Sequence, residues 1–353
     1  MDNKTQIEVI LGNSNSRFSG VTSTMLRVLE YHKDEINIAV LGKHHLPEDI
    51  NSLSFFECAK ICKKLLANGK HRVFHARRNN EVIQALILKK IFRAKIKIIF
   101  TSTAQREHTW ITRWLIRQVD SVVATCSGAA AVLKRNPDAI IPHGVDPETY
   151  TLPVDGKKVE WASLGYPGEY GIGIFARIRA QKGIGILVDA MIPIMKENPA
   201  PTVLIAGETT QSNERFVKKL KEKIKEENLE KRIIFLGKIH YDNEVPKLMR
   251  GLSIVTALST IEGFGLPVLE AMASGCAVVA SRTGAWEDII EENVHGKLVP
   301  CNDTKSTHKA LKELTENYPN LEKMGISGRN RVKELYTIKS EAKSLLDLYQ
   351  RQE

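Results

Sequence analysis

The chain has 353 residues, of which 42% are hydrophobic and 26% are charged, a composition typical of a globular protein of two domains. Five scattered cysteines without a C-x-x-C pair argue against a disulfide framework and favour a reducing compartment. The net charge is +10. No apolar run reaches the roughly 18 residues of a membrane span, and the N-terminus lacks a signal-peptide pattern, so we expect neither a membrane-spanning segment nor a signal peptide.

The positive charge is concentrated in one segment. Residues 60–118 contain fifteen Lys and Arg but only two acidic residues, which leaves +13 in this segment. Such a basic patch implies an anionic partner, and nucleic acid, an anionic membrane face and a phosphorylated acceptor all fit. A solvated surface without a partner is the remaining alternative.

The first half of the chain alternates apolar strands with helices, which predicts a parallel, doubly wound sheet. We expect strands over 7–11, 36–41, 73–75, 96–100, 121–125 and 140–146. We expect helices through 25–29 and over 55–66, 81–92, 111–118 and 129–133.

Polar loops follow several of these strands. Residues 12–20 form a glycine-containing loop before a helix start, where an anion or acceptor site is possible, although the G-x-G-x-x-G spacing is missing. Arg77 and Arg78 follow the third strand, at the edge where open α/β sheets bind ligands. The loop after the fourth strand carries further polar candidates, namely Gln105, Arg106 and His108. A lone histidine is as often an ordinary surface residue.

Between residues 150 and 169 the periodic pattern lapses, and proline and glycine crowd together, so we place the interdomain linker there. The expected domains are 1–165 and 166–335, with a final helical segment at 336–353. The second half carries expected strands over 171–175, 203–207, 233–237, 254–257 and 276–280, and expected helices over 213–227, 245–250, 307–318, 320–335 and 338–352. The helix at 213–227 is dense in Lys and Glu at i,i+4 spacing, which is typical of a solvated face.

The most informative stretch is residues 260–281, TIEGFGLPVLEAMASGCAVVAS. A glycine-broken loop leads into a short helix that Pro267 opens and Gly275 ends. The helix start offers free N–H groups and a partial positive charge, which suit a diphosphate. Glu262 and Glu270 could both accept hydrogen bonds from the hydroxyls of one ligand, or they could be a surface and a capping glutamate of an ordinary loop and helix.

Two glutamates eight apart with Gly-Phe-Gly-Leu-Pro between them resemble the signature of the retaining glycosyltransferases of family four, which have the GT-B fold. Arg177 and Lys182 resemble a cation pair of that family, with Ala176 in place of a glycine. Residues 140–146, IIPHGVD, resemble another of its segments, with His143 in place of an asparagine. One departure is that residues 101–103 lack the histidine that many members carry beside the sugar.

The resemblance implies two Rossmann-like domains facing a cleft, with the C-terminal helix crossing back to the first domain. It also implies transfer of a sugar from a nucleotide-sugar donor with retention of configuration at the anomeric carbon. It implies that Arg177 and Lys182 stabilise the diphosphate, Glu262 binds sugar hydroxyls and Glu270 binds the ribose. There is no D-x-D pair, and Arg177, Lys182 and the helix dipole can replace the charge of a cation, so we expect no metal. Beyond the nucleotide-sugar substrate, no cofactor is expected. The expected catalytic residues are Glu262, Arg177, Lys182 and His108; the expected donor-binding residues are Gly20, Gly207, Lys238, Gly263, Phe264, Gly265, Leu266 and Glu270; the expected acceptor-binding residues are Arg77, Arg78, Gln105 and Arg106.

Residues 19–24, 75–79, 100–109 and 141–146 together resemble the lipopolysaccharide inner-core transferases, particularly mannosyltransferases acting on Kdo-lipid A. This resemblance implies an anionic, lipid-linked acceptor and a cytoplasmic enzyme held peripherally at the anionic inner membrane, with no nucleic-acid partner. GDP-mannose is the favoured donor, with UDP-glucose or UDP-N-acetylglucosamine next. The alternatives are a hexosyltransferase with another lipid or protein acceptor, a nucleotide-sugar epimerase, and a non-enzymatic binder of anionic surfaces or nucleic acid. The non-enzymatic binder would use the basic patch, which lacks the interleaved aromatic residues expected for stacking on single-stranded nucleic acid.

Overall fold

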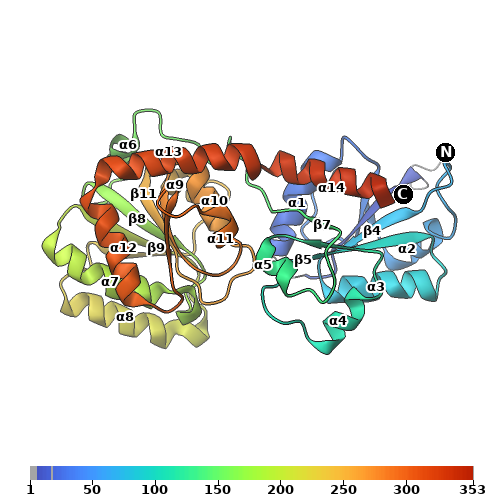
Figure 1. The fold of residues 1–353 in the computed structure, drawn as a ribbon, viewed down its shortest axis with the longest axis horizontal. Coiled ribbons are helices and arrows are strands. Elements are labelled where there is room, and N and C mark those ends of the chain that lie inside the picture. The colour runs from blue at the N-terminus through green and yellow to red at the C-terminus, as the bar shows by residue number, and fades with distance from the viewer. Residues whose placement is uncertain (1–5, 17–18, 353) are drawn as a thin grey trace. The chain divides into compact units, whose positions relative to one another are not determined.

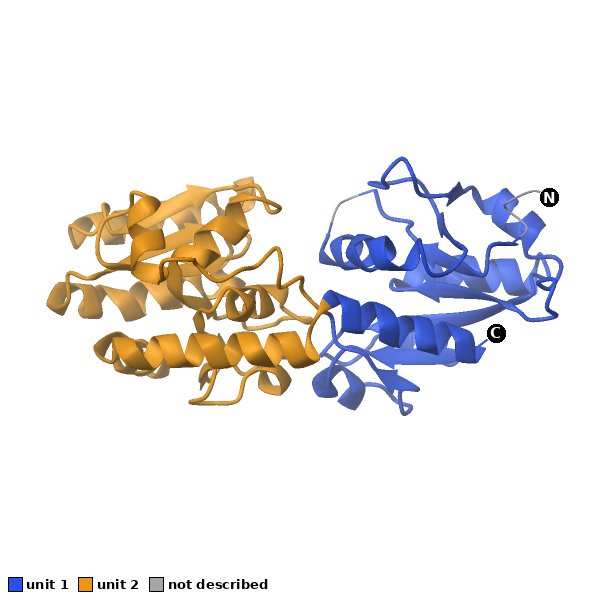
Figure 2. Ribbon diagram, turned by 90° about the horizontal axis from the view of Figure 1, so that it is seen from above, with its two compact units in different colours: residues 1–143, 338–353 blue, residues 144–337 orange. Residues whose placement is uncertain are grey.

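The structure, a computed structural model, describes residues 6–16 and 19–352. The chain forms two compact units: residues 1–143 with 338–353 make up unit 1, and residues 144–337 make up unit 2 (Figure 2). In its described parts, no helix combines the length and the apolar character that crossing a bilayer requires.

Unit 1 is built on a parallel sheet with the strand order β3-β2-β1-β4-β5-β6-β7 (Figure 1). This is the Rossmann order, in which the direction of winding reverses between β1 and β4. The strands are β1 (Val9–Gly12), β2 (Ile38–Leu41), β3 (Ser52–Leu53), β4 (Arg72–Ala76), β5 (Ile96–Ser102), β6 (Ser121–Ala124) and β7 (Ala139–Ile140). The helices are α1 (Gly20–His32), α2 (Phe55–Ile61), α3 (Asn79–Lys90), α4 (Trp110–Ile116), α5 (Ser127–Ala131) and α14 (Ile338–Gln352).

Unit 2 repeats this topology with the order β10-β9-β8-β11-β12-β13, so its reversal lies between β8 and β11. The strands are β8 (Tyr170–Phe175), β9 (Pro201–Ala206), β10 (Ile233–Gly237), β11 (Leu252–Ala257), β12 (Ala277–Ser281) and β13 (Gly296–Val299). The α-helices are α6 (Lys157–Ser163), α7 (Ile184–Glu197), α8 (Glu214–Glu226), α9 (Glu244–Gly251), α10 (Leu266–Ala273), α11 (Trp286–Ile289), α12 (Thr304–Glu316) and α13 (Tyr318–Leu335), and the short 3₁₀ turns are η2 (Ala180–Lys182) and η3 (Gln211–Asn213).

The two parallel sheets confirm the doubly wound fold that the apolar runs predicted. Strands of such a sheet are covered by helices on both faces and are therefore apolar along their length. Every residue of β1, β4 and β11 is buried.

Helix α2 is shorter than the predicted 55–66. It begins at a capping box, in which the Ser54 and Glu57 side chains each accept from the other's backbone N–H. It ends at Ile61, and the carbonyl of the next residue, Cys62, accepts from the Lys95 amide at 2.6 Å instead of from a further turn of helix.

The segment expected to link the domains contains helix α6 and belongs to unit 2. Trp161 packs against Gly171, where an added Cβ would lie 2.2 Å from the indole ring. The buried Lys157 ammonium donates to the carbonyls of Arg250 at 3.1 Å and Ser274 at 2.9 Å. Neither the packing partner nor the buried cation has a local sequence signal, so the proline and glycine content of this segment gave no indication of α6.

The C-terminal helix α14 packs in unit 1, as expected, and buried polar contacts hold it there. His32 Nε2 lies 2.7 Å from the Ala342 carbonyl oxygen. His75 Nδ1 lies 2.7 Å from the Tyr349 hydroxyl, and its Nε2 lies 2.7 Å from Thr101 Oγ1. Complete burial, with the nearby Arg77 charge, holds the pKa of His75 well below 6.5, so the ring is neutral in the folded chain.

This burial predicts acid destabilisation. Below about pH 6.5 the unfolded chain binds a proton at residue 75 while the folded chain does not, so the stability present at neutral pH is lost as the pH falls. His75→Gln should reduce the pH dependence of the unfolding free energy by up to about 1.4 kcal/mol per pH unit below that value. Urea unfolding at a series of pH values below about 6.5 measures this pH dependence, and His240→Gln, at an exposed histidine, is the control. Identical pH slopes for wild type and His75→Gln would contradict the prediction.

Candidate active site

The reversal point of the unit 2 sheet brings two predicted catalytic residues into contact. Lys182 follows β8 and Glu262 follows β11, and these strands are neighbours although the two residues are 80 positions apart. Lys182 Nζ donates to Glu262 Oε2 at 2.5 Å, and Ser259 Oγ donates to the same oxygen at 3.2 Å. Both charged side chains are about one fifth exposed, so a ligand can reach them.

Two glycines with positive φ let these loops approach each other. Gly183 has φ +73, and an added Cβ would lie 2.2 Å from the Leu258 carbonyl oxygen. Gly265 has φ +84, and its added Cβ would lie 2.3 Å from Trp286 Nε1. A side chain at either position would be strained in backbone and would collide with fixed atoms. The glycine requirement therefore comes from the shape of this site.

Helix α10 begins directly after this loop, as the sequence predicts. Pro267 lies in its first turn, and the buried Phe264 anchors the loop before it. The other end is neutralised by two buried cations: Arg329 donates to the Ala273 carbonyl, and Lys157 donates to the Ser274 carbonyl. The amino end of α10 begins four residues after Glu262, the partner of Lys182, and the first N–H groups of a helix have no acceptor within the helix.

The remaining unit 2 candidates lie at the same edge of the sheet. Arg177 is an exposed residue of the loop after β8, and an added Cβ on Gly207 would lie 3.3 Å from its backbone nitrogen. Lys238 is exposed in the turn after β10. Glu270 is completely buried in α10, where its carboxylate accepts from the Tyr241 hydroxyl.

Sequence reasoning did not select Ser259 and Tyr241, which contact the two glutamates. Ser259 lies only three residues before Glu262, so its proximity to the motif was an available signal. Tyr241 is 29 residues from Glu270 and reaches it through the loop after β10, a contact that no local pattern announces.

Unit 1 contains a pocket of about 420 Å³ at the carboxyl end of β5. Three predicted site residues line it together, namely Arg77, Arg106 and His108. Hydroxyl-bearing side chains complete much of the wall, namely Thr101, Ser102, Thr103, Thr109 and Thr112. Partial burial, with the charges of Arg113 and Arg106, lowers the pKa of His108. The pocket thus combines two guanidinium groups, the Glu107 carboxylate, a neutral imidazole and hydroxyls. The two cations outnumber the one anion, which suits a ligand with a carboxylate or phosphate and sugar hydroxyls.

Three other unit 1 candidates do not line this pocket. Arg78 donates to the buried Glu81 at 2.8 Å, and to Ser19 and Thr22 at 3.0 and 2.9 Å, so its guanidinium ties the loops after β1 and β4 together. Gln105 donates to Cys126 Sγ at 3.0 Å. Gly20 is the exposed first residue of α1. Residues 17 and 18 of the predicted glycine loop lie outside the described residues.

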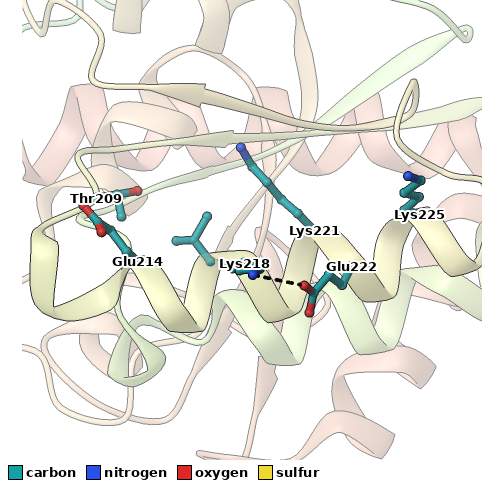
Figure 3. A pocket seen from close by; sticks show the side chains of 7 residues that line it. Thr209, Glu214, Lys218, Lys221, Glu222 and Lys225 are labelled. Carbon is teal, nitrogen blue, oxygen red and sulfur yellow. Dashed lines mark ion pairs between the residues drawn. The ribbon is translucent and has the colours of Figure 1, made fainter.

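A second hollow, of about 520 Å³, runs along α8 in unit 2 (Figure 3). It is lined by Lys218, Lys221, Glu222 and Lys225 among others, with an ion pair of 3.9 Å between Lys218 and Glu222. Lys221 lies over the Phe235 ring at 5.4 Å. No predicted site residue lines this hollow, and its charges follow the i,i+4 pattern of the predicted solvated face.

Comparison with known proteins places the chain in a family. The family model described as "Glycosyl transferases group 1" matches residues 160–331. The chain is 34% identical to the lipopolysaccharide core biosynthesis mannosyltransferase LpsB of Rhizobium meliloti (strain 1021), over 98% of this chain and 97% of the relative. The chain belongs to the group 1 glycosyltransferases. A second relative, the lipopolysaccharide core biosynthesis mannosyltransferase LpcC of Rhizobium leguminosarum bv. viciae, is 38% identical over 86% of this glycosyltransferase and 85% of the relative.

Solved structures agree with the expected GT-B fold. Anabaena Alr3699/HepE in complex with UDP matches 98% of this glycosyltransferase and 100% of that chain with a TM-score of 0.83, and at 17% identity it shows the fold alone. The C-terminal domain of LpcC, a group 1 family protein from Francisella tularensis, matches 55% of this chain and 100% of that chain with 39% identity and a TM-score of 0.53. The family and the fold expected from the sequence are confirmed.

The glycine geometry in this glycosyltransferase yields a stability prediction. Gly265→Ala should lower the free energy of unfolding by about 1–3 kcal/mol, because alanine resists the left-handed backbone and its Cβ meets Trp286. Gly20→Ala is the matched control, since Gly20 has no atom within 4 Å of an added Cβ, and its stability should stay the same or rise slightly. Urea unfolding of both variants tests this, and equal stabilities would refute the steric argument.

Proposed function

We propose that this chain is a retaining, metal-independent mannosyltransferase of lipopolysaccharide core biosynthesis, with GDP-mannose as donor and the Kdo region of Kdo-lipid A as acceptor. The observation that carries the proposal is the similarity to two lipopolysaccharide core mannosyltransferases, which spans 98% and 86% of this chain. The Lys182–Glu262 contact beside a helix start supports it, as does the pocket of arginines and hydroxyls in unit 1. We also propose that the enzyme works on the cytoplasmic face of the anionic inner membrane.

In the proposed reaction, the bond between the sugar's anomeric carbon and the diphosphate oxygen breaks, and negative charge grows on the leaving phosphate. An acceptor hydroxyl oxygen forms the new bond to the anomeric carbon on the same face, and its proton passes to the leaving diphosphate. Lys182 and the amino end of α10 are held in place before the reaction, so they stabilise this charge with little reorganisation. Arg177 supplies a second cation from the loop after β8. These groups take the part that a divalent cation has in metal-dependent transferases.

Glu262 is proposed to exchange part of its contact with Lys182 for hydroxyls of the transferred sugar, helped by the N–H groups of residues 263–265. Glu270 is proposed to bind the ribose, whose hydroxyl would take the position of the Tyr241 hydroxyl. Gly207, Lys238 and Leu266 are proposed to border the nucleotide from the neighbouring loops.

A donor panel tests the reaction itself. Kdo-lipid A is incubated with GDP-mannose, UDP-glucose or UDP-N-acetylglucosamine, and the product is identified by mass spectrometry. We expect mannose to be transferred only from GDP-mannose, with the α-configuration at the anomeric centre kept. Transfer from a UDP-sugar alone, or hydrolysis without transfer, would contradict the proposal.

Substitution of the charged pair tests the donor site. Lys182→Met and Glu262→Gln should each lower kcat by at least about a hundredfold, because each removes an interaction with developing charge or with the reacting sugar. Folding should change little, since a partly exposed ion pair contributes at most about 1 kcal/mol. Lys218→Met on α8 is the matched control and should keep wild-type turnover. Wild-type kcat in either site variant would reject the assignment.

Acceptor binding by the unit 1 pocket is testable through KM. Arg106→Ala should raise the acceptor KM about tenfold or more and leave the donor KM unchanged, because it removes one charge-assisted contact to an acidic acceptor. Lys134→Ala, at an exposed cation outside the pocket, should not change either constant. If Arg106→Ala affected a neutral methyl-ester acceptor as strongly as the acid, the proposed charge pairing would be wrong.

A further inference from the structure

Unit 1 exposes several large apolar side chains on neighbouring elements. Phe56 of α2 is 74% exposed, and Ile91, just after α3, is 70% exposed. On α4, Trp110 is 73%, Trp114 49% and Ile111 45% exposed. We call these five residues the aromatic face.

Ring contacts connect these elements. Lys90 Nζ lies 6.0 Å from the centroid of the Trp114 ring, which joins the end of α3 to α4. The Phe92 ring lies 5.6 Å from Phe55 and 6.3 Å from Phe56, which joins the same turn to α2. Figure 1 shows α3 and α4 beside each other in unit 1. These contacts bring α2, the end of α3 and α4 together, so the residues of the aromatic face lie on adjoining elements.

The helical period explains why α4 presents this surface. Thr112, Leu115 and Ile116 are buried against the unit, so Trp110, Ile111 and Trp114 point outward. Exposed cations stand close to these residues in the chain: Lys90, Arg93 and Arg117 are exposed, and all three belong to the segment that carries +13. Exposed tryptophan and isoleucine with lysine and arginine around them have the chemistry of a membrane-surface anchor.

We propose that the aromatic face docks on an anionic lipid bilayer, with Trp110, Trp114 and the neighbouring isoleucines entering the boundary between headgroups and acyl chains. Lys90, Arg93 and Arg117 then lie at the level of the lipid phosphates, where each cation strengthens binding about fivefold. The proposal deepens the proposed function, on which it rests for a lipid-linked acceptor. The binding step itself needs neither donor nor acceptor.

The tryptophans provide a direct probe. The chain has four, and Trp161 and Trp286 are each only 1% exposed, so a change of emission on binding reports on Trp110 and Trp114. The full chain is mixed with vesicles of phosphatidylethanolamine and phosphatidylglycerol, or with neutral phosphatidylcholine vesicles. We expect a blue shift and quenching by brominated acyl chains with the anionic vesicles, and much weaker binding to the neutral ones.

Variants separate insertion from simple charge attraction. Trp110→Ala with Trp114→Ala should weaken co-sedimentation with anionic vesicles at least about tenfold, whereas Trp110→Phe with Trp114→Phe should keep most of the binding. Val154→Ala with Ile326→Ala, at exposed apolar residues of unit 2, is the matched control and should bind like wild type. Undiminished binding by the double alanine variant overturns the proposal. Binding without quenching by brominated lipid also overturns the proposal. A DNA duplex that competes with the vesicles for the protein on equal terms overturns it as well.

Turnover on a water-soluble Kdo acceptor keeps this result distinct from the proposed function. The double alanine variant should keep wild-type kcat on that acceptor and lose activity only on acceptor presented in vesicles. Absence of turnover by the wild type would defeat the proposed function and leave the vesicle result standing. Equal activity of variant and wild type on vesicle-borne acceptor would defeat the docking proposal alone.

Discussion

The candidate donor site depends on two loops meeting where the unit 2 sheet reverses its winding. Parallel strands place their carboxyl ends at one edge, and the pairing of β8 with β11 puts Lys182 and Glu262 side by side. The Thr260 amide donates to the Gln181 carbonyl at 2.9 Å, so the two loops are joined through backbone as well. Because a partly exposed ion pair contributes little stability, its main effect is to hold a cation and a carboxylate in defined places.

Unit 1 has the same strand order but uses its reversal point differently. Arg78 and Glu81 follow β4 and bind the loop after β1, and an added Cβ on Gly12 would lie 2.9 Å from Glu81. The Glu81 carboxylate and the Arg78 guanidinium thus lie at the reversal point, where a ligand would bind in such a sheet. The pocket with Arg77 and Arg106 forms one strand further along, after β5. One topology therefore gives two different kinds of site.

Buried polar groups hold the helices that present these sites. Lys157 and Arg329 come from segments before and after α10 in the chain and meet at its carboxyl end. Burial lowers the pKa of Lys157, so its contacts to backbone carbonyls are what keep a cation tolerable there. In unit 1 the Tyr349 hydroxyl, whose pKa burial raises to about 12, stays protonated and can donate to His75.

The sequence by itself determined the doubly wound class, the glycosyltransferase family and the stretch around Glu262, because apolar periodicity and the spacing of glycine, proline and glutamate are local properties. It also selected Lys182, Arg106 and His108 by type and position. Only the tertiary structure decided that Lys182 contacts Glu262, that Arg78 is committed to Glu81, that Tyr241 meets Glu270, and that residues 157–163 form a helix of unit 2. These outcomes depend on strand order and on contacts between residues far apart in the chain, where the free energy of packing and of pairing buried charges outweighs any local preference.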